Sequence, residues 1–210
     1  MDDGDVIKIG YSCEDWERHY ETNDLGWDLG EVAPPFVHLW EERKISPGRA
    51  IIPGCGCGHE AIFLAEQGFQ ITALDYTRGA LGRLEKALIK KNLSGELLRQ
   101  DFFQLDSEYN NSFDLMLENT FFCAINPAMR QNYVSTAARI LKTGALLVGL
   151  FYETDKEGGP PFNTRKSDIE ESFSEQFAIE VLSKTPYSAE QRQGKEWLGI
   201  FKKNSPAKAS

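Results

Sequence analysis

One stretch, residues 50–75, constrains the fold of this chain more than any other. It begins with a short apolar run, as in a buried strand, and continues as a glycine-rich loop, a helix and a second strand. Gly54, Gly56 and Gly58 allow the loop to take positive φ angles and allow a ligand to approach the backbone closely. The second strand ends at Asp75. Such a unit predicts an α/β fold in which the helix directs its first amide groups at a ligand.

The spacing of the glycines indicates which ligand this is. The loop has the pattern G-x-G-x-G, which is tighter than the G-x-G-x-x-G of dinucleotide-binding proteins. A plain tight turn is the simplest explanation of the glycines alone, but strand, helix and terminal acid together indicate a nucleoside-type cofactor. Because a tight loop leaves no cradle for a pyrophosphate, it favours S-adenosyl-L-methionine over NAD. We expect Asp75 to accept hydrogen bonds from the ribose hydroxyls.

The rest of the chain alternates between strand-like and helix-like segments. Five strands that alternate with helices predict a mostly parallel sheet with helices on both faces. Only a loop separates the last two of seven strands, which predicts a C-terminal antiparallel hairpin. The expected helices are 14–20, 36–42, 59–67, 78–91, 127–142 and 167–173, and the expected strands are 50–52, 69–75, 96–99, 113–118, 145–152, 177–183 and 197–202.

Length and termini predict one domain. A chain of 210 residues suits a single domain with a sizeable core. We expect that domain at residues 14–203, with a flexible segment at 1–13 and a disordered tail at 204–210. Its first part, residues 14–46, is aromatic and is called the lid segment below. The acidic start of the chain is unlike a secretory signal, so a cytoplasmic location is expected.

Charge and hydropathy exclude two classes of partner. The net charge of −9 argues against nucleic acid, whose electrostatic binding needs a basic surface. No apolar run approaches the ~20 residues that span a bilayer, so no membrane association is expected. The predicted partner is a small molecule, and the protein is expected to be a monomer or a homodimer.

The four cysteines are expected to be free thiols. They are Cys13, Cys55, Cys57 and Cys123, in a chain without an export signal, where disulfides are rare. Cys55, Cys57 and His59 resemble zinc ligands in their spacing. No second cluster with metal spacing accompanies them, so the sequence predicts no metal site.

The polar first half of the lid segment carries Trp16, Tyr20 and Trp27. One interpretation is that they fasten this segment to the core. The other is a lid of aromatic faces over a cation, which is worth about 1–2 kcal/mol in a desolvated contact. Both interpretations remain open at this point.

Four separated stretches match the motifs of one known family. Residues 52–60 (IPGCGCGHE) match its glycine loop, and the spaced aromatic residues of 16–28 match its N-terminal segment. Residues 121–130 match the motif after the fourth strand, and residues 152–161 match the loop after the fifth. Together they resemble the thiopurine methyltransferase family, and within it the branch of plant and microbial thiol and halide methyltransferases. The likeness covers residues 14–202.

The resemblance implies a Rossmann-like class I methyltransferase sandwich that uses S-adenosyl-L-methionine. Tyr20, Asn119 and Tyr152 are then the expected catalytic residues, and Trp27, Phe121 and Tyr152 the expected substrate-binding residues. The branch usually has tyrosine at position 119 and tryptophan at position 20, so this chain departs from it there. The expected cofactor-binding residues are Trp16, Tyr20, Trp27, Gly54, Cys55, Gly56, Gly58, Asp75, Tyr76, Asp101, Phe102 and Asn119.

The implied reaction is an in-line displacement, in which a nucleophile attacks the methyl carbon and a thioether leaves. A soft nucleophile needs no strong general base, which agrees with the absence of a Ser-His-Asp or paired-carboxylate pattern. Halide, hydrosulfide, thiocyanate, an organic thiol and a metalloid anion all remain open as acceptors. Two other functions also remain open: a protein that binds the cofactor without turnover, and an NAD-dependent reductase.

Overall fold

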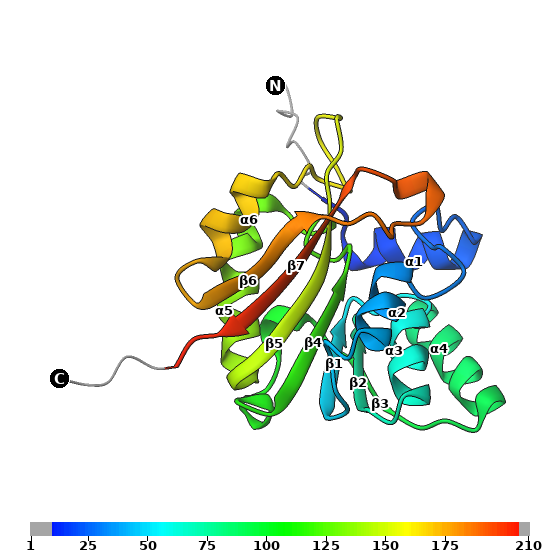
Figure 1. The fold of residues 1–210 in the computed structure, drawn as a ribbon. Helices are drawn as coiled ribbons and strands as arrows, with labels where there is room; N and C mark the ends of the chain where they lie inside the picture. Colours follow the sequence, from blue (N-terminus) through cyan, green and yellow to red (C-terminus); the bar gives the residue numbers. More distant parts are fainter. Residues whose placement is uncertain (1–9, 206–210) are drawn as a thin grey trace, which may run out of the picture.

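The sheet at the centre of the molecule has seven strands in the spatial order β3-β2-β1-β4-β5-β7-β6 (Figure 1). The structure is a computed structural model and describes residues 10–205. Strands β1 to β5 run parallel to one another, and β7 runs antiparallel to both β5 and β6. The strands are β1 (Arg49–Pro53), β2 (Gln70–Asp75), β3 (Glu96–Arg99), β4 (Phe113–Asn119), β5 (Leu141–Tyr152), β6 (Phe177–Lys184) and β7 (Glu196–Lys203).

Helices cover both faces of this sheet, as predicted. Helices α2, α3 and α4 contribute to one apolar cluster, and α5 and α6 contribute to the other. Helix α1 lies beyond the carboxyl ends of the strands (Figure 1). The helices are α1 (Cys13–Thr22), α2 (Pro34–Glu41), α3 (His59–Glu66), α4 (Arg78–Lys91), α5 (Arg130–Ile140) and α6 (Lys166–Phe173), with short 3₁₀ turns η1 (Phe102–Gln104), η2 (Ser107–Tyr109), η3 (Pro127–Met129) and η4 (Glu190–Arg192).

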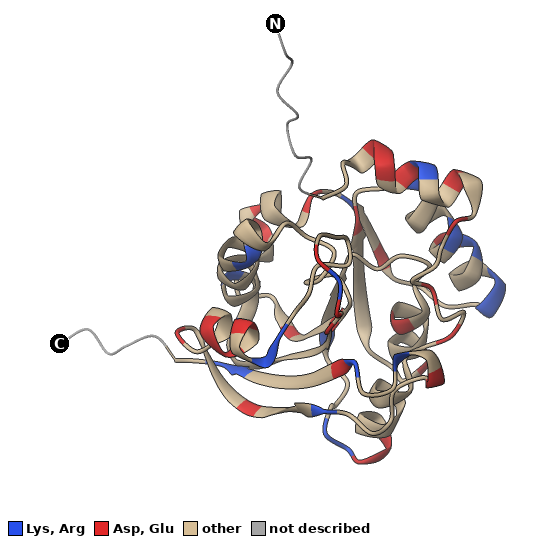
Figure 2. Cartoon of the chain, turned by 90° about the horizontal axis from the view of Figure 1, so that it is seen from above, with Lys and Arg blue, Asp and Glu red and all other residues tan. Residues whose placement is uncertain are grey.

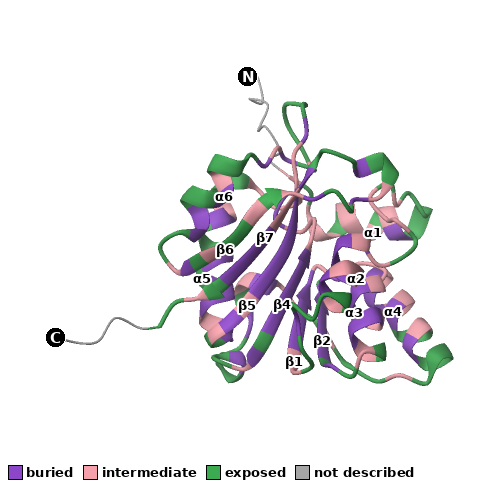
Figure 3. Ribbon diagram, viewed as in Figure 1, coloured by how far each residue is buried: buried purple, intermediate pink, exposed green. Residues whose placement is uncertain are grey.

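The central strands are buried on both faces (Figure 3). On β1, Ala50 and Ile52 belong to the cluster beneath α2–α4, whereas Ile51 belongs to the cluster beneath α5 and α6. This alternation follows from the two-residue period of a strand. A strand buried on both faces must be apolar throughout, which explains the short apolar run that begins the unit at residues 50–75.

The order of the strands determines where a ligand can bind. From β1 the chain proceeds to β2 and β3 on one side, and then crosses to β4 and β5 on the other. Ala50 pairs with Ile71 of β2 and with Leu115 of β4, so β1 and β4 are adjacent at this reversal. In open α/β sheets, ligands bind at the carboxyl ends of the strands that flank such a switch point.

The structure differs from the predicted elements mainly around α5 and β5. The segment from Pro127 begins as a 3₁₀ turn, because the Asn126 side chain accepts a hydrogen bond from the amide of Ala128, and α5 starts three residues later. Strand β5 begins at Leu141, four residues before the predicted start. Gly144 has φ +77°, which interrupts the strand pattern in the sequence although Leu141 is fully buried in the sheet.

The expectations for residues 1–9 and 206–210 lie outside the described residues. At the beginning of the described part, Ser12 and Asp15 form a capping box on α1. At its end, the Asn204 side chain donates to the carbonyl of Glu175 (3.2 Å). No helix within residues 10–205 is both long enough and apolar enough to cross a membrane.

Candidate active site

The glycine loop between β1 and α3 has a backbone that only glycine fits. Gly54 has φ +58°, and a Cβ atom there would lie 2.7 Å from the ring of Phe121. Gly58 has φ +81°, and a Cβ atom there would lie 2.4 Å from Leu84 of α4. Gly54 therefore lets the Phe121 ring pack against the loop, and Gly58 permits close packing of α3 against α4. The amide of Cys55 donates to the carbonyl of Leu74 (3.0 Å), which holds the loop beside the end of β2.

Asp75 lies at the end of β2, beside this loop. Its Oδ2 accepts from the amide of Gly56 (3.2 Å), and its Oδ1 accepts from the amide (2.9 Å) and the hydroxyl (2.7 Å) of Thr77. Burial raises the pKa of the Asp75 carboxyl, and these hydrogen bonds oppose the increase. Because a carboxylate offers about four lone-pair sites, Oδ2 can accept one more donor. The carboxylate therefore has the position and the capacity to bind a ribose hydroxyl.

Glu17 fastens α1 to the first turn of α4. Its carboxylate accepts from the amides of Arg78 (2.7 Å) and Gly79 (2.8 Å). A Cβ atom at Gly79 would lie 2.3 Å from Cβ of Tyr20, so the absence of a side chain lets the helices meet. Arg83 of α4 also donates to the carbonyl of Tyr20 (2.9 Å). No sequence pattern indicates these contacts, because Glu17 lies on a polar face of its helix.

The aromatic rings in the first half of the lid segment, of Trp16, Tyr20 and Trp27, pack on one another. The rings of Trp16 and Trp27 are nearly perpendicular, with centroids 5.1 Å apart, and the rings of Tyr20 and Trp27 are 5.9 Å apart. Tyr20 is buried, and burial raises the pKa of its phenol well above the usual value. The burial of Tyr20 agrees with the fastening interpretation for that residue. Contact of these rings with a cationic cofactor remains a prediction.

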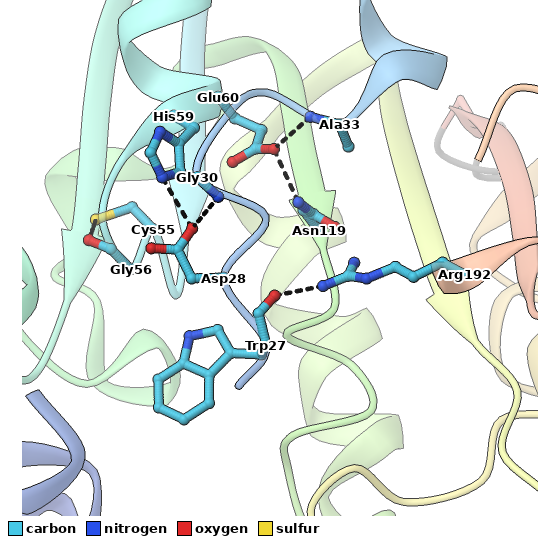
Figure 4. A network of polar contacts seen from close by, with 10 residues as sticks. All are labelled: Trp27, Asp28, Gly30, Ala33, Cys55, Gly56, His59, Glu60, Asn119 and Arg192. Atoms are coloured by element: carbon cyan, nitrogen blue, oxygen red, sulfur yellow. Dashed lines mark hydrogen bonds and ion pairs between the residues drawn. The ribbon is translucent and has the colours of Figure 1, made fainter. Parts of the chain in front are cut away.

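Polar contacts with His59, Glu60 and Arg192 hold residues 27–33 of the lid segment (Figure 4). Asp28 pairs with Nε2 of His59 at 2.9 Å. Glu60 accepts from the amide of Ala33 at 3.1 Å. Arg192, in the turn between β6 and β7, donates to the carbonyl of Trp27 and to the buried carboxylate of Glu196. Sequence reasoning missed Arg192, because it belongs to a polar run without periodicity.

Asn119 ends β4 beneath this lid. Its Nδ2 donates to Oε1 of Glu60 (2.8 Å), while its Oδ1 is buried and has no partner within residues 10–205. Burial raises the pKa of the Glu60 carboxyl. Thr120 follows with φ +63°, a strained value for a β-branched residue, which turns the chain sharply out of the sheet. Glu118 supports that turn from below, accepting from the amide of Phe122 (2.9 Å).

A cavity of about 710 Å³ unites these groups at the predicted edge of the sheet. It contains all the predicted site residues except Gly58, which packs against α4 instead. It also contains residues that sequence reasoning did not assign to the site, among them Asp28, Glu60 and Arg192. The predicted residues that line it are Trp16, Tyr20, Trp27, Gly54, Cys55, Gly56, Asp75, Tyr76, Asp101, Phe102, Asn119, Phe121 and Tyr152.

Comparisons with known proteins agree with this geometry. The family model for thiopurine S-methyltransferase matches residues 11–205. Thiocyanate methyltransferase 1 of Brassica oleracea is 34% identical, over 90% of this chain and 84% of its own length. Thiopurine S-methyltransferase of Shewanella loihica is 27% identical, over 83% of this chain and 88% of its own.

A solved structure shows the same fold. It is the 1,6-didemethyltoxoflavin-N1-methyltransferase of Burkholderia thailandensis with bound S-adenosylhomocysteine, which aligns with a TM-score of 0.75 at 16% identity. The alignment covers 92% of this chain and 87% of that one. With the family model spanning the described chain and a relative above 30% identity, the chain belongs to the thiopurine S-methyltransferase family and is an S-adenosyl-L-methionine-dependent methyltransferase.

Proposed function

We propose that this enzyme methylates a small, soft and anionic nucleophile, such as thiocyanate, hydrosulfide, a thiolate or a halide. The observation that carries the proposal is the single cavity, which joins the glycine loop and Asp75 to an aromatic wall and one buried cation, Arg192. The relatives named thiocyanate methyltransferase and probable thiol methyltransferase support this class of acceptor.

The residues of the cavity fit S-adenosyl-L-methionine. The volume is within the range of small-molecule sites, about 300–1,000 Å³. Gly54 and Gly56 line the cavity without side chains, and Asp75 retains an acceptor for a ribose hydroxyl. Trp16, Tyr20 and Trp27 would provide aromatic faces for the sulfonium, and Asp101 with Phe102 would border the adenine. When bound, the cofactor supplies an electrophilic methyl group.

The acceptor would enter on the opposite side of the cavity. Phe121 and Tyr152 line that part together with Asn119. Arg192 is 7% exposed, and one of its two partners, the Trp27 carbonyl, is uncharged. Its other partner is the buried carboxylate of Glu196 at 3.1 Å, so the guanidinium would hold an anion through its remaining N–H donors, and desolvation there makes the anion a better nucleophile.

The residues of the site need not move a proton from such an acceptor. Their contribution is to align the nucleophile with the methyl carbon and exclude water, an effect worth up to about 7–11 kcal/mol. Tyr20, Asn119 and Tyr152 are the residues that we expect to contact the reacting groups. The three polar ties on the lid segment, from His59, Glu60 and Arg192, keep that alignment.

A small molecule is also the partner that the charge pattern supports. Lys and Arg positions are interspersed with Asp and Glu along the described chain (Figure 2), and the net charge is −9. Nucleic acid would meet net repulsion. A cytoplasmic monomer or homodimer remains our working assumption for the assembly and its location.

The experiment is a panel of acceptors with methyl-labelled cofactor. Thiocyanate, hydrosulfide, iodide, thiophenol and a thiopurine are each incubated with the enzyme, and volatile or extractable methylated product is counted. We expect turnover with at least one anionic acceptor, and we expect Arg192→Lys to raise its KM more than it lowers kcat. Binding of S-adenosylhomocysteine without product from any acceptor would refute the proposed substrate class.

A further inference from the structure

Three side chains with different donor atoms converge on the cavity wall where the lid segment meets the glycine loop. They are Asp28 from the lid, Cys57 from the loop and His59 from the first turn of α3. One carboxylate oxygen, the Sγ atom and one ring nitrogen all lie within 4.8 Å of one another. Among these atoms, Asp28 Oδ1 and His59 Nε2 are 2.9 Å apart.

We propose that Asp28, Cys57 and His59 form a binding site for one thiophilic divalent cation, with Zn²⁺ as the best match. Carboxylate, thiolate and imidazole are the three ligand types that Zn²⁺ takes in proteins, with bonds of about 2.0–2.3 Å. Tetrahedral ligands at such bond lengths lie about 3.3–3.7 Å from one another. The donor atoms are close to that spacing already, and side-chain rotation closes the rest.

The cluster differs from the one that the cysteine spacing suggests. Cys55 is not part of it, because its sulfur faces the carbonyl of Gly56 (3.9 Å) rather than Asp28 (Figure 4). The third ligand comes from Asp28, far away in the sequence, so counting local Cys and His spacings does not find it. The fold brings the lid segment to the loop and completes the set.

The charges balance when the cation binds. Cys57 releases its thiol proton to solvent, and His59, if protonated, releases a second. The carboxylate of Asp28 and the thiolate of Cys57 then offset the two positive charges of the cation, and His59 is neutral. A site without net charge avoids most of the desolvation cost at a partly buried wall. The hydrogen bond between Asp28 and His59 is replaced by two metal–ligand bonds.

All three residues line the cavity, so the fourth coordination position faces it. Because one ligand lies on the lid segment and two lie on the loop, the cation would connect these two parts. A ligand that binds only the folded state raises the free energy of unfolding by RT ln(1 + [L]/Kd). The bound cation should therefore raise the melting temperature of the protein, independently of any acceptor or cofactor.

The test uses Co²⁺ as a spectroscopic probe on the full chain, after treatment with a chelator and a non-thiol reductant. We expect one equivalent of Co²⁺ to produce a thiolate-to-cobalt charge-transfer band and a rise in melting temperature. One equivalent of Zn²⁺ should abolish the band, since Zn²⁺ binds such sites more tightly than Co²⁺. Loss of an outer-shell partner weakens metal binding by roughly 10–100-fold, so loss of a direct ligand should weaken Co²⁺ binding by more than ~100-fold.

The variants are Cys57→Ser and a matched control, Cys13→Ser, which alters another half-buried thiol outside the cluster. The band should disappear in Cys57→Ser and persist in Cys13→Ser. Asp28→Asn, which keeps the size of the side chain, should weaken Co²⁺ binding while retaining the band, and it serves if Cys57→Ser fails to fold. Absence of the band at one equivalent, or its persistence in Cys57→Ser, would overturn the proposal.

Discussion

Removal of the Glu17 carboxylate tests how α1 is held over the cofactor cavity. Glu17 lies on α1, and its two oxygens accept from two amides in the first turn of α4. It does not line the cavity, whereas Trp16 and Tyr20 on the same helix do. Glu17→Ala should therefore impair cofactor binding indirectly, by freeing the helix that carries these two rings.

The size of the effect follows from the two hydrogen bonds. A hydrogen bond to a charged group contributes about 1.5–3 kcal/mol, but Arg78 is exposed and Gly79 only half-buried, so water can replace part of each. Loss of a side chain that caps a helix N-terminus costs about 0.5–2 kcal/mol. We expect a net loss of about 1–2 kcal/mol in the docking of α1, a factor of about 5–30 in cofactor affinity.

Isothermal titration with S-adenosylhomocysteine measures this affinity directly. Glu17→Gln should have an intermediate effect, because one amide oxygen can still accept from one backbone amide. Glu21→Ala is the matched control, since Glu21 is exposed on the same helix. At saturating cofactor, kcat of Glu17→Ala should remain near the wild-type value. An affinity of Glu17→Ala within twofold of that of Glu21→Ala would refute the reasoning.

Three further predictions concern Gly58, Asp75 and Glu118. Gly58→Ala should destabilise the fold by about 1–3 kcal/mol in urea unfolding, because of its positive φ and its contact with α4, whereas Gly82→Ala, which points into open space, should not. Asp75→Ala should weaken S-adenosylhomocysteine binding by about 1.5–3 kcal/mol in the same titration, and unchanged affinity would contradict the ribose role. Burial raises the pKa of Glu118 from its usual 4.5 to about 8, so between these values the unfolded chain has lost a proton that the folded chain keeps. Stability should therefore fall as pH rises from about 4.5 to 8. Glu118→Gln should show a smaller decrease over that window, and an equal decrease would exclude Glu118 as its source.

The sequence predicted the parts of the site that are local in the chain. Strand, glycine loop, α3 and β2 are consecutive, so their relative positions follow from βαβ geometry, and Asp75 could be placed beside the loop. The alternation of strands and helices along the chain likewise predicted a mostly parallel sheet with helices on both faces. The start of β5 was missed because Gly144 breaks the apolar pattern there.

The contacts that complete the site join distant parts of the chain, and no local pattern indicates them. Arg192 contacts Trp27 across 165 positions, and Glu17 contacts Arg78 across 61. Each is a charged residue in a polar run, where periodicity predicts only exposure to solvent. Glu60 lies in the first turn of the predicted helix 59–67, and its side chain is buried between the lid segment and β4. Polar groups of this kind become informative only when the fold supplies their partners.

The lid segment consists of two parts that differ in what holds them. Its second part, α2, is anchored by apolar burial, since Phe36 is fully buried and Leu39 nearly so. Most of its first part, residues 14–30, is half-buried or exposed, and polar ties to Asp28, Trp27 and Glu17 hold it along with the buried ring of Tyr20. Hydrogen bonds exchange with water at a small net cost, whereas a buried aromatic side chain does not. Residues 14–30 bury one such ring, that of Tyr20, whereas α2 buries Pro35, Phe36 and Leu39. We therefore expect residues 14–30 to open at a lower cost than α2 when a cofactor enters the cavity beneath them.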